Sequence, residues 1–246
     1  MGNEGQKINW ITQQDMGEAH CDTCHLRPRC VMSAIPEKNL FSAKKNVRMI
    51  TPKRRGDVIY RTGEPAQGLF ILHAGSAQTS LAWHGEYQII CDYHLPGDAL
   101  ELAGLYMGKH TTTCMALESA HLCELSRESL LNLSKTYPKL QEFISLRTSR
   151  ALVESQQRQL DIACKTVEQR LANFLLALSS RYAERGYSAH TFRLPMKRQE
   201  IANHLGMRTE TLSRLLTTFR RQKLIRIEGR EVHLVQRKQL RLLANS

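Results

Sequence analysis

Three cysteines near the N-terminus are spaced closely enough to act together, in the pattern C-x2-C-x5-C. They are Cys21, Cys24 and Cys30, whereas the other four cysteines are scattered along the chain, at Cys91, Cys114, Cys123 and Cys164. The N-terminal segment lacks the apolar run of a secretion signal, so we expect a cytoplasmic protein in a reducing compartment. Clustered thiols in such a compartment bind metal or carry out redox chemistry rather than form a disulfide framework. Because three thiolates do not complete a tetrahedral site, a fourth ligand must come from elsewhere.

The segment 198–222 contains the second group of residues with chemical potential, and its spacing predicts a helix-turn-helix. A first short helix ends at a glycine, and Thr209 is expected to cap the start of the second helix. In that second helix Glu210, Ser213 and Arg214 share one face, because they stand at i, i+3 and i+4. The opposite face is apolar and is expected to be buried through Leu212, Leu215, Leu216 and Phe219.

The polar face of this second helix has the donors and acceptors that recognition of double-stranded DNA requires. Arginine can donate two hydrogen bonds to guanine, glutamate can accept one from cytosine, and serine can contact a base or a phosphate. Two apolar runs, 224–228 and 232–235, follow and predict a β-hairpin, the wing. The alternative is a helical hairpin in which Glu210 and Arg214 merely form an ion pair. Contacts to DNA phosphates are expected from Arg208, Thr209, Arg220, Arg221 and Lys223.

Charge is distributed unevenly along the 246 residues, in a way that favours a polyanionic partner. The whole chain has 35 Lys and Arg against 23 Asp and Glu, a net charge of +12. From Thr191 onward there are 13 basic and 4 acidic residues, so this part alone carries +9. With 41% hydrophobic and 24% charged residues, the composition is that of a globular protein. No apolar run approaches the roughly 20 residues of a membrane span, so we expect no membrane association.

The first part of the chain predicts an arm and a β-domain that position the cysteines. Residues 1–40 form a polar arm, and residues 41–137 contain short apolar runs separated by Gly, Asp and Pro, which predict strands. The pentapeptide RGDVI at 55–59 is echoed by PGDAL at 96–100, as in a jelly roll or β-roll, although a generic β-sandwich would also fit. The expected strands include 58–60, 69–72, 88–90 and 121–125.

A long segment without Gly or Pro predicts a helix at 138–164, which is followed by the DNA-binding domain at 165–246. The long helix has no partner helix beside it in sequence, so pairing with its twin in a homodimer is the economical way to bury its apolar positions. Polar residues interrupt the middle of this seam, so we expect monomer and dimer to lie close in free energy. The alternative is a constitutive dimer that the β-roll also holds. The seam is expected to involve Leu140, Ile144, Leu152, Ser155 and Gln159.

The order of these parts resembles the cAMP receptor protein superfamily and, within it, the fumarate and nitrate reduction regulator (FNR) family. The resemblance covers nearly the whole chain, from about Cys21 to about Val235. Its most specific features are the C-x2-C-x5-C arm, the remote cysteine in LCEL at 122–125, and the E-x-x-S-R element of the second short helix. The stretch RLANFLLALSSRYAERGYS at 170–188 is also similar to that family.

This resemblance implies an α+β fold with a cysteine arm, a β-roll (jelly-roll) sensor domain like that of cyclic-nucleotide-binding proteins, a dimerisation helix and a winged helix-turn-helix. It implies an oxygen- or redox-responsive activator or repressor of anaerobic genes. Such a homodimer would bind an inverted repeat close to TTGAT-N4-ATCAA and work with RNA polymerase. In the family pattern Arg214 reads a guanine, Glu210 its paired cytosine and Ser213 the neighbouring thymine. The ligands of an oxygen-labile 4Fe-4S cluster would be Cys21, Cys24, Cys30 and Cys123.

Zinc is the main alternative at the cysteines, because three of them with His20 or His25 would also give a tetrahedral site. A zinc-bound or cluster-free regulator of the same superfamily would respond to another signal. Positive charge from His25, Arg27 and Arg29 beside the ligands is expected to raise the reduction potential of a cluster. Of the remaining cysteines, Cys91 and Cys114 are expected to pack in the β-roll and Cys164 to lie in a linker.

Two other classes of function agree less well with the sequence. Cyclic-nucleotide-binding members of the superfamily carry an arginine in the phosphate-binding stretch. The corresponding residues here read LELAG at 100–104 and HTTT at 110–113, so we expect no binding of a cyclic nucleotide. A redox enzyme or electron carrier would have no use for a helix-turn-helix, and the sequence contains no Ser/His/Asp, P-loop or dinucleotide motif. We therefore expect a regulator and not an enzyme.

Overall fold

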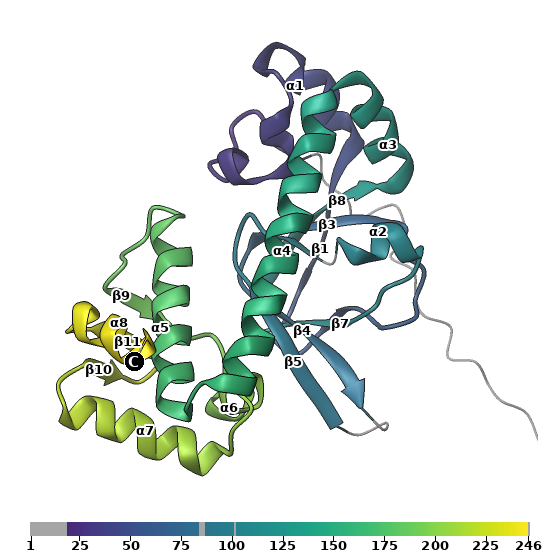
Figure 1. Ribbon diagram of the computed structural model, residues 1–246. Helices are drawn as coiled ribbons and strands as arrows, with labels where there is room; N and C mark the ends of the chain where they lie inside the picture. The colour runs from purple at the N-terminus through teal and green to yellow at the C-terminus, as the bar shows by residue number, and fades with distance from the viewer. Residues whose placement is uncertain (1–18, 84–86, 101, 246) are drawn as a thin grey trace, which may run out of the picture.

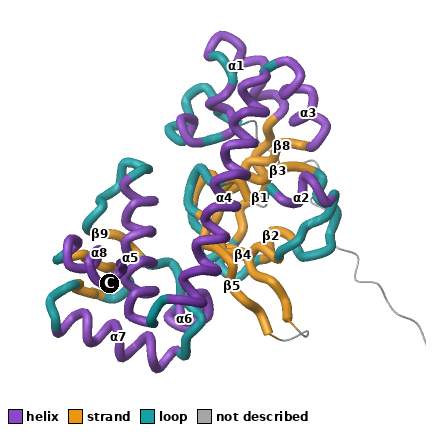
Figure 2. The backbone as a smooth tube through the Cα atoms, in the orientation of Figure 1, coloured by secondary structure: helices purple, strands orange, loops and turns teal. Residues whose placement is uncertain are grey.

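The protein is an α+β molecule, as the sequence predicts (Figure 1). The structure, a computed structural model, describes residues 19–83, 87–100 and 102–245, so the first part of the expected arm lies outside the described residues. A cysteine-bearing arm and a β-roll lead into one long helix, which runs to a C-terminal helix-turn-helix domain. Figure 2 shows the strands gathered in the β-roll, with a smaller group in the C-terminal domain. Among the described helices, none combines the length and apolar character of a membrane span.

The β-roll consists of two four-stranded antiparallel sheets, with strand orders β1-β8-β3-β6 and β2-β7-β4-β5. Side chains from both sheets share a buried core, which includes Leu72 and Leu122 of the first sheet and Ala77 and Cys114 of the second. The four strands expected from the sequence are confirmed. The strand bounds are β1 Val47–Lys53, β2 Val58–Tyr60, β3 Gly68–Ala74, β4 Ala77–Trp83, β5 Tyr87–His94, β6 Ala99–Leu100, β7 Thr113–Ala116 and β8 Ala120–Ser126.

The repeated pentapeptide forms the same turn twice. Gly56 and Gly97 have φ values of 89° and 90°, a backbone region that favours glycine. The aspartate after each glycine accepts a hydrogen bond from the backbone N–H three residues before it, at 2.7 Å for Asp57 and 2.8 Å for Asp98. The two turns differ in their surroundings. A Cβ added at Gly56 would meet nothing within 4 Å, whereas one at Gly97 would lie 3.2 Å from the Cβ of Arg29.

Short helices of the arm and the β-roll precede the long helix α4 (Pro138–Cys164), whose existence the sequence predicts. The first turns of α4 pack on their own subunit, because Leu140 is fully buried there and Ile144 is half-buried in the core shared with the arm. This corrects the expectation that Leu140 belongs to the seam between twin helices, since its side chain has no surface left. The short helices are α1 Glu37–Ala43, α2 Ala103–Met107 and α3 Arg127–Thr136, with 3-10 helices at Arg27–Arg29, Val31–Ala34 and Lys44–Asn46.

The rest of α4 exposes apolar side chains in the single chain. Leu152 is 59% exposed, Gln159 is exposed and Ser155 is half-buried. Cys164 is the exposed last residue of α4 and does not lie in a linker, which corrects a second expectation. Further large apolar side chains are exposed along the same helix: Leu160 and Ile162, which the helical spacing of apolar residues includes, and Leu146 and Val153, which it does not.

The C-terminal domain is the winged helix-turn-helix that the sequence predicts. Its core includes Leu212, Phe219, Val232 and Leu240, each at most 1% exposed. One detail was wrong: the N-cap of α7 is Arg208, whose backbone is extended, and Thr209 is already the first helical residue. The bounds are α5 Val167–Ala183, β9 Thr191–Arg193, α6 Arg198–His204, α7 Thr209–Arg221, β10 Ile225–Glu228, β11 Glu231–Leu234 and α8 Arg237–Asn245.

Candidate cysteine site and DNA-binding surface

Strand β8 places Cys123 on the side of the β-roll that faces the arm. Alternation along the strand directs Leu122 into the core between the sheets, so Cys123 points the other way. Its partners across the sheet are Met49 on β1 and Ile71 on β3, and paired residues share a face. The Cys123 thiol lies 3.5 Å from the sulfur of Met49. The fourth cysteine thus stands on a mostly apolar sheet surface.

The arm folds onto this surface because it has an apolar anchor of its own. Val31, Met32 and Ile35 are at most 2% exposed, and they share a core with β1, β3 and α4. Two backbone hydrogen bonds, from the N–H of Cys30 to the carbonyls of Leu26 and Arg27, both 3.1 Å long, fix the turn before this anchor. Packing of the anchor therefore holds the cysteines of the arm against the sheet.

The four cysteines that the resemblance selects, Cys21, Cys24, Cys30 and Cys123, line one cavity of about 500 Å³. The other three cysteines do not line it. Most of the wall is apolar and includes Ala19, Leu26, Met32, Val47, Met49, Ile71 and Leu72. The chain thus brings four thiols together in an apolar space. This space is much larger than one metal ion needs, since even a water molecule occupies only about 30 Å³.

The environment of the cavity disfavours the thiolate form of three of its cysteines. Burial, reinforced by the neighbouring thiols, raises the pKa of Cys21 to about 11 and the pKa values of Cys30 and Cys123 to about 12. Metal ligation requires thiolates, so a bound centre must displace these protons. The cysteines are therefore suited to a strongly bound, multiply charged centre and are poor nucleophiles without one.

Histidines stand at the rim of the cavity, and sequence reasoning missed one of them. Nδ1 of His73 lies 3.9 Å from the sulfur of Cys24, and the rings of His73 and His25 are 6.4 Å apart between centroids. His73 follows Ile71 by two residues on β3, so it faces the arm as Cys123 does. Only the pairing of β3 with β8 reveals this, because no local motif in the sequence includes His73.

The spacing of the donors bears on the zinc alternative. Zinc binds its ligands at about 2.0–2.3 Å, so the ligand atoms of a tetrahedral site lie within about 4 Å of one another. Among the residues the structure describes, no three His, Cys, Asp or Glu side chains are arranged to hold a single metal ion. A 4Fe-4S cluster distributes its four thiolates over separate irons and so suits a wider donor set. The donors and the volume of the cavity fit the cluster better than a single ion.

Helix α7 presents the residues selected for reading DNA to solvent. Glu210 and Arg214 are exposed and Ser213 is half-buried. No ion pair joins Glu210 to Arg214 in the described part of the chain, contrary to the alternative of a salt-bridged helical hairpin. Thr209 is half-buried, and the other side chains expected at phosphates are exposed: Arg208, Arg220, Arg221 and Lys223.

The turn after α7 has an unusual backbone at one of these residues. Lys223 has φ of 57°, the only described residue other than glycine with a positive φ. This left-handed position follows the helix C-cap, where glycine is preferred because a Cβ is crowded. The chain thus keeps a lysine where the backbone would favour glycine, at the junction of the recognition helix and the wing.

Known proteins resemble this chain over most of its length. A family model described as a Crp-like helix-turn-helix domain matches residues 169–243, and one described as a cyclic nucleotide-binding domain matches residues 52–137. The fumarate and nitrate reduction regulatory protein of Vibrio cholerae is 30% identical, covering 92% of this chain and 90% of the relative. The transcriptional activator protein anr of Pseudomonas aeruginosa is 36% identical over 95% of this chain and 96% of its own. The chain belongs to the FNR family of Crp/Fnr transcription regulators.

A solved structure agrees with this family assignment. FixK2 from Bradyrhizobium japonicum has a TM-score of 0.73 and 26% identity, and the match covers 80% of this chain and 96% of that one. The FNR-family chain is therefore a DNA-binding regulator of the Crp/Fnr type. That its β-roll binds no cyclic nucleotide stays a prediction. The match to the family model of that domain supports the fold of the β-roll and does not test whether a nucleotide binds. Glu101, part of the stretch on which the expectation depends, lies outside the described residues.

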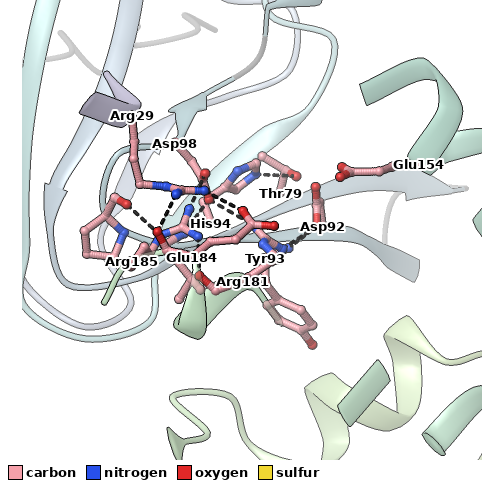
Figure 3. Close-up of polar contacts among 12 residues, drawn as sticks. Arg29, Thr79, Asp92, Tyr93, His94, Asp98, Glu154, Arg181, Glu184 and Arg185 are labelled. Carbon is pink, nitrogen blue, oxygen red and sulfur yellow. Dashed lines mark hydrogen bonds and ion pairs between the residues drawn. The ribbon is translucent and has the colours of Figure 1, made fainter. Parts of the chain in front are cut away.

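In this FNR-family chain the DNA-binding domain contacts the β-roll of its own subunit through α5, through α6 and through a hydrogen bond of 3.5 Å from Arg55 to the carbonyl of Pro195. At the end of α5, Arg181 pairs with Asp98 at 2.8 Å and with Asp92 at 3.4 Å, and Arg185 also pairs with Asp98 (Figure 3). Burial alone would raise the pKa of Asp98, but these two arginines outweigh burial and hold it below its usual value. The second copy of the repeated turn, which contains Asp98, thus holds the end of α5. The first copy, which contains Asp57, does not have this role.

Another contact joins α6 to the edge strand β5. The side-chain amide of Asn203 accepts a hydrogen bond from the N–H of Ile90 and donates one to the carbonyl of Gln88, both 2.7 Å long. Nδ1 of His204 lies 3.0 Å from the Ile90 carbonyl. An edge strand has unpaired backbone groups, and here α6 satisfies them. The helix-turn-helix is therefore docked on the sensor domain through several polar contacts, none of which the sequence alone indicated.

Proposed function

We propose that this protein is an oxygen- or redox-responsive transcription regulator of anaerobic gene expression that carries a 4Fe-4S cluster. The supporting observation is the convergence of Cys21, Cys24, Cys30 and Cys123 on one apolar cavity of about 500 Å³. Relatives at similar distance support the biological role, because they include an anaerobic regulatory protein from Pasteurella multocida, 31% identical over 92% of this chain. Family membership by itself supports DNA binding and regulation.

In this proposal the four cysteines are the cluster ligands, and the apolar wall limits the access of water. A bound iron–sulfur cluster supplies the group that reacts with oxidants. Arg27 lines the cavity and places positive charge beside the ligands, which favours the reduced form of the cluster, whereas the guanidinium of Arg29 reaches away to Glu184. Loss of the cluster would leave one buried and two half-buried thiols with raised pKa values and remove the link between the arm and β8.

On DNA, the exposed face of α7 would enter the major groove of an inverted repeat close to TTGAT-N4-ATCAA. Arg214 would donate to a guanine, Glu210 accept from its paired cytosine and Ser213 contact the neighbouring thymine. The flanking residues would contact phosphates and so add affinity without sequence preference. RNA polymerase would be the partner at the promoter. The residues assigned to the DNA backbone are Arg208, Thr209, Arg220, Arg221 and Lys223.

Two half-sites one helical turn apart require two subunits, so the proposed DNA-binding form is a homodimer. The exposed length of α4, with Leu152, Ser155 and Gln159, would form the seam. Because two of these three positions are polar, the seam is weak, and a change in the arm could shift the balance between monomer and dimer. Ile144 of α4 packs against the core that includes the arm, so a change at the cysteine site would act directly on this helix.

The deciding experiment is metal and sulfide analysis of protein purified without oxygen. We expect a brown protein with about four irons and four sulfides per chain. Its affinity for the inverted repeat, measured by fluorescence anisotropy, should fall after exposure to air, while affinity for random DNA changes little. One zinc per chain without visible absorbance would instead establish the zinc-bound alternative. A colourless, metal-free protein that binds the repeat equally well in air would establish a cluster-free regulator.

A further inference from the structure

Arg29 connects the cysteine arm directly to the DNA-binding domain. It immediately precedes Cys30, yet its guanidinium reaches the end of α5. One terminal nitrogen donates to the backbone carbonyl of Glu184 and the other to the carboxylate of the same residue (Figure 3). Because the guanidinium is planar and both of its arms are used, the contact fixes a direction as well as a distance.

The backbone of Arg29 is held firmly at the arm end of this contact. Its N–H donates to the carbonyl of Leu26 at 2.9 Å, and its own carbonyl accepts a hydrogen bond from Arg147 of α4 at 2.8 Å. Its Cβ lies under Gly97, where a further Cβ would approach to 3.2 Å. Arg29 therefore cannot shift independently of the turn that carries Cys30, and a displacement of Cys30 must move it.

The other end of the contact lies where the DNA-binding domain meets the rest of the subunit. Glu184 is the C-cap of α5, and its carboxylate is also 3.7 Å from Arg150 of α4. The neighbouring Arg181 and Arg185 form the pairs with Asp98 described above. The side chains of Arg29 and Glu184 are 23% and 34% exposed, so solvent screens this pair only in part. A displacement of Arg29 thus acts on Glu184 at the end of α5, where the DNA-binding domain meets the rest of the subunit.

We propose that Arg29 is a positioning residue that holds the DNA-binding domain at the angle set by the folded cysteine arm. When the arm is folded around its cavity, the contact between Arg29 and Glu184 adds a further point of support to those at Asp98, at β5 and at Arg55. When the arm loosens, this support is lost, and the domain turns about the contacts that remain. The state of the arm then reaches the DNA-binding domain within one subunit, in addition to any change in dimerisation. The inference depends on the proposed function only for what folds or loosens the arm.

The test is a double-mutant cycle in the anaerobic full-length protein, with Arg29→Ala, Glu184→Ala and the combination of both. Alanine keeps the Cβ of Arg29 under Gly97. Lys38→Ala is the control, because it removes a cation from the same arm at an exposed position that does not line the cavity. Iron content and dimer fraction are measured for each variant. Affinity is measured for the full inverted repeat and for a duplex with one half-site.

We expect each single variant to lose about three- to tenfold in affinity for the full repeat, the scale of coupling between contacting residues. The double variant should be no weaker than the weaker single one. Lys38→Ala should bind like the original protein. Iron content, dimer fraction and half-site affinity should stay unchanged, because the reading helix is intact and only the relative placement of two domains is altered. Arg29→Lys, which keeps the charge without the planar fork, should resemble Arg29→Ala.

Several outcomes would overturn the inference. Unchanged affinity in Arg29→Ala would do so, as would losses that simply add in the double variant. Loss of iron in Arg29→Ala but not in Glu184→Ala would mean that Arg29 acts on the cysteine site. Protein isolated without iron and sulfide would refute the proposed function, but the cycle would still be read on DNA binding. If the double-mutant cycle still showed coupling between Arg29 and Glu184 in that protein, the positioning role would stand. If the two losses of affinity were additive, the positioning role would be refuted independently of the proposed function.

Discussion

The DNA-reading surface and the cysteine cavity are built in opposite ways. Glu210, Ser213 and Arg214 lie within two turns of one helix, so the geometry of α7 alone aligns them. The cavity joins an arm to a strand far along the chain, and only packing of the arm on the β-roll brings Cys30 near Cys123. The first site is as stable as its helix, whereas the second exists only while two separate elements stay together.

This difference suits the two regions to different tasks. A surface fixed by local structure presents the same hydrogen-bonding groups in every state of the protein. A site shared between two separate elements is lost when either element moves, which is the property a switch requires. The arm contacts α4 through Ile144 and Arg147. Loosening of the arm would therefore remove contacts from the helix that connects the two regions.

The most severe test of this difference between the two regions removes Cys123, the proposed ligand that lies far from the arm in sequence. In Cys123→Ser we expect complete loss of the visible chromophore and of iron in anaerobically purified protein, because a neutral hydroxyl does not replace a thiolate. Cys24→Ser should behave likewise. Cys164→Ser and Cys91→Ser are controls outside the cavity and should keep the chromophore, as should Cys114→Ser. Retention of four irons in Cys123→Ser would mean that the arm binds the cluster without β8, and the contrast drawn above would be wrong.

The second prediction concerns α4, which lies between the two regions. Replacing Ser155 and Gln159 by leucine should strengthen the proposed seam, since a fully buried leucine contributes about 1.5–3 kcal/mol. Light scattering should then find a dimer in air, and DNA binding should become largely insensitive to air. The same pair of substitutions should leave iron content unchanged. A wild-type protein that loses its cluster in air and remains dimeric at micromolar concentration would rule out dimerisation as the switch.

The local site could be predicted from the sequence almost completely. The periodicity at 198–222 indicated both helices and the buried face of α7, and the hairpin signals indicated the wing. The error at Thr209 has a simple cause: threonine is a good N-cap, but the backbone becomes helical one residue earlier, after an extended Arg208. Boundaries of this kind depend on the path of the preceding turn, which propensities do not determine.

The shared site could not be predicted from residue spacing alone. Spacing gave the three cysteines of the arm, but the choice of Cys123 required a resemblance to a known family. The participation of His73 follows only from the register of β3 and β8. Leu140 was assigned to the wrong partner, because helical periodicity shows that a residue is buried and not what buries it. The contacts of Arg29 and Asp98 with the DNA-binding domain are likewise matters of tertiary packing.

The third prediction separates base reading from general attraction to DNA. Arg214→Ala should weaken binding to the inverted repeat by about 1–3 kcal/mol and relax the preference at one base pair. Lys223→Ala should weaken binding to all sequences alike and lower the dependence on salt concentration. Competition assays with single-base variants of the repeat measure the first effect, and a salt titration measures the second. Equal losses of Arg214→Ala on specific and random DNA would refute the base-reading role.

The last prediction uses the unusual backbone of Lys223 to ask what the lysine does. At φ of 57° glycine avoids the crowding of a Cβ, so Lys223→Gly should raise the free energy of unfolding by about 0.5–1 kcal/mol. Lys223→Ala removes the same charge and keeps the Cβ, so it is the matched control and should leave stability nearly unchanged. Both variants should weaken DNA binding equally, because both lose the same cation. Urea unfolding and anisotropy on random DNA measure the two quantities. If Lys223→Gly gained stability and kept full affinity, the lysine would contribute nothing at phosphates, and the reading surface would end with α7.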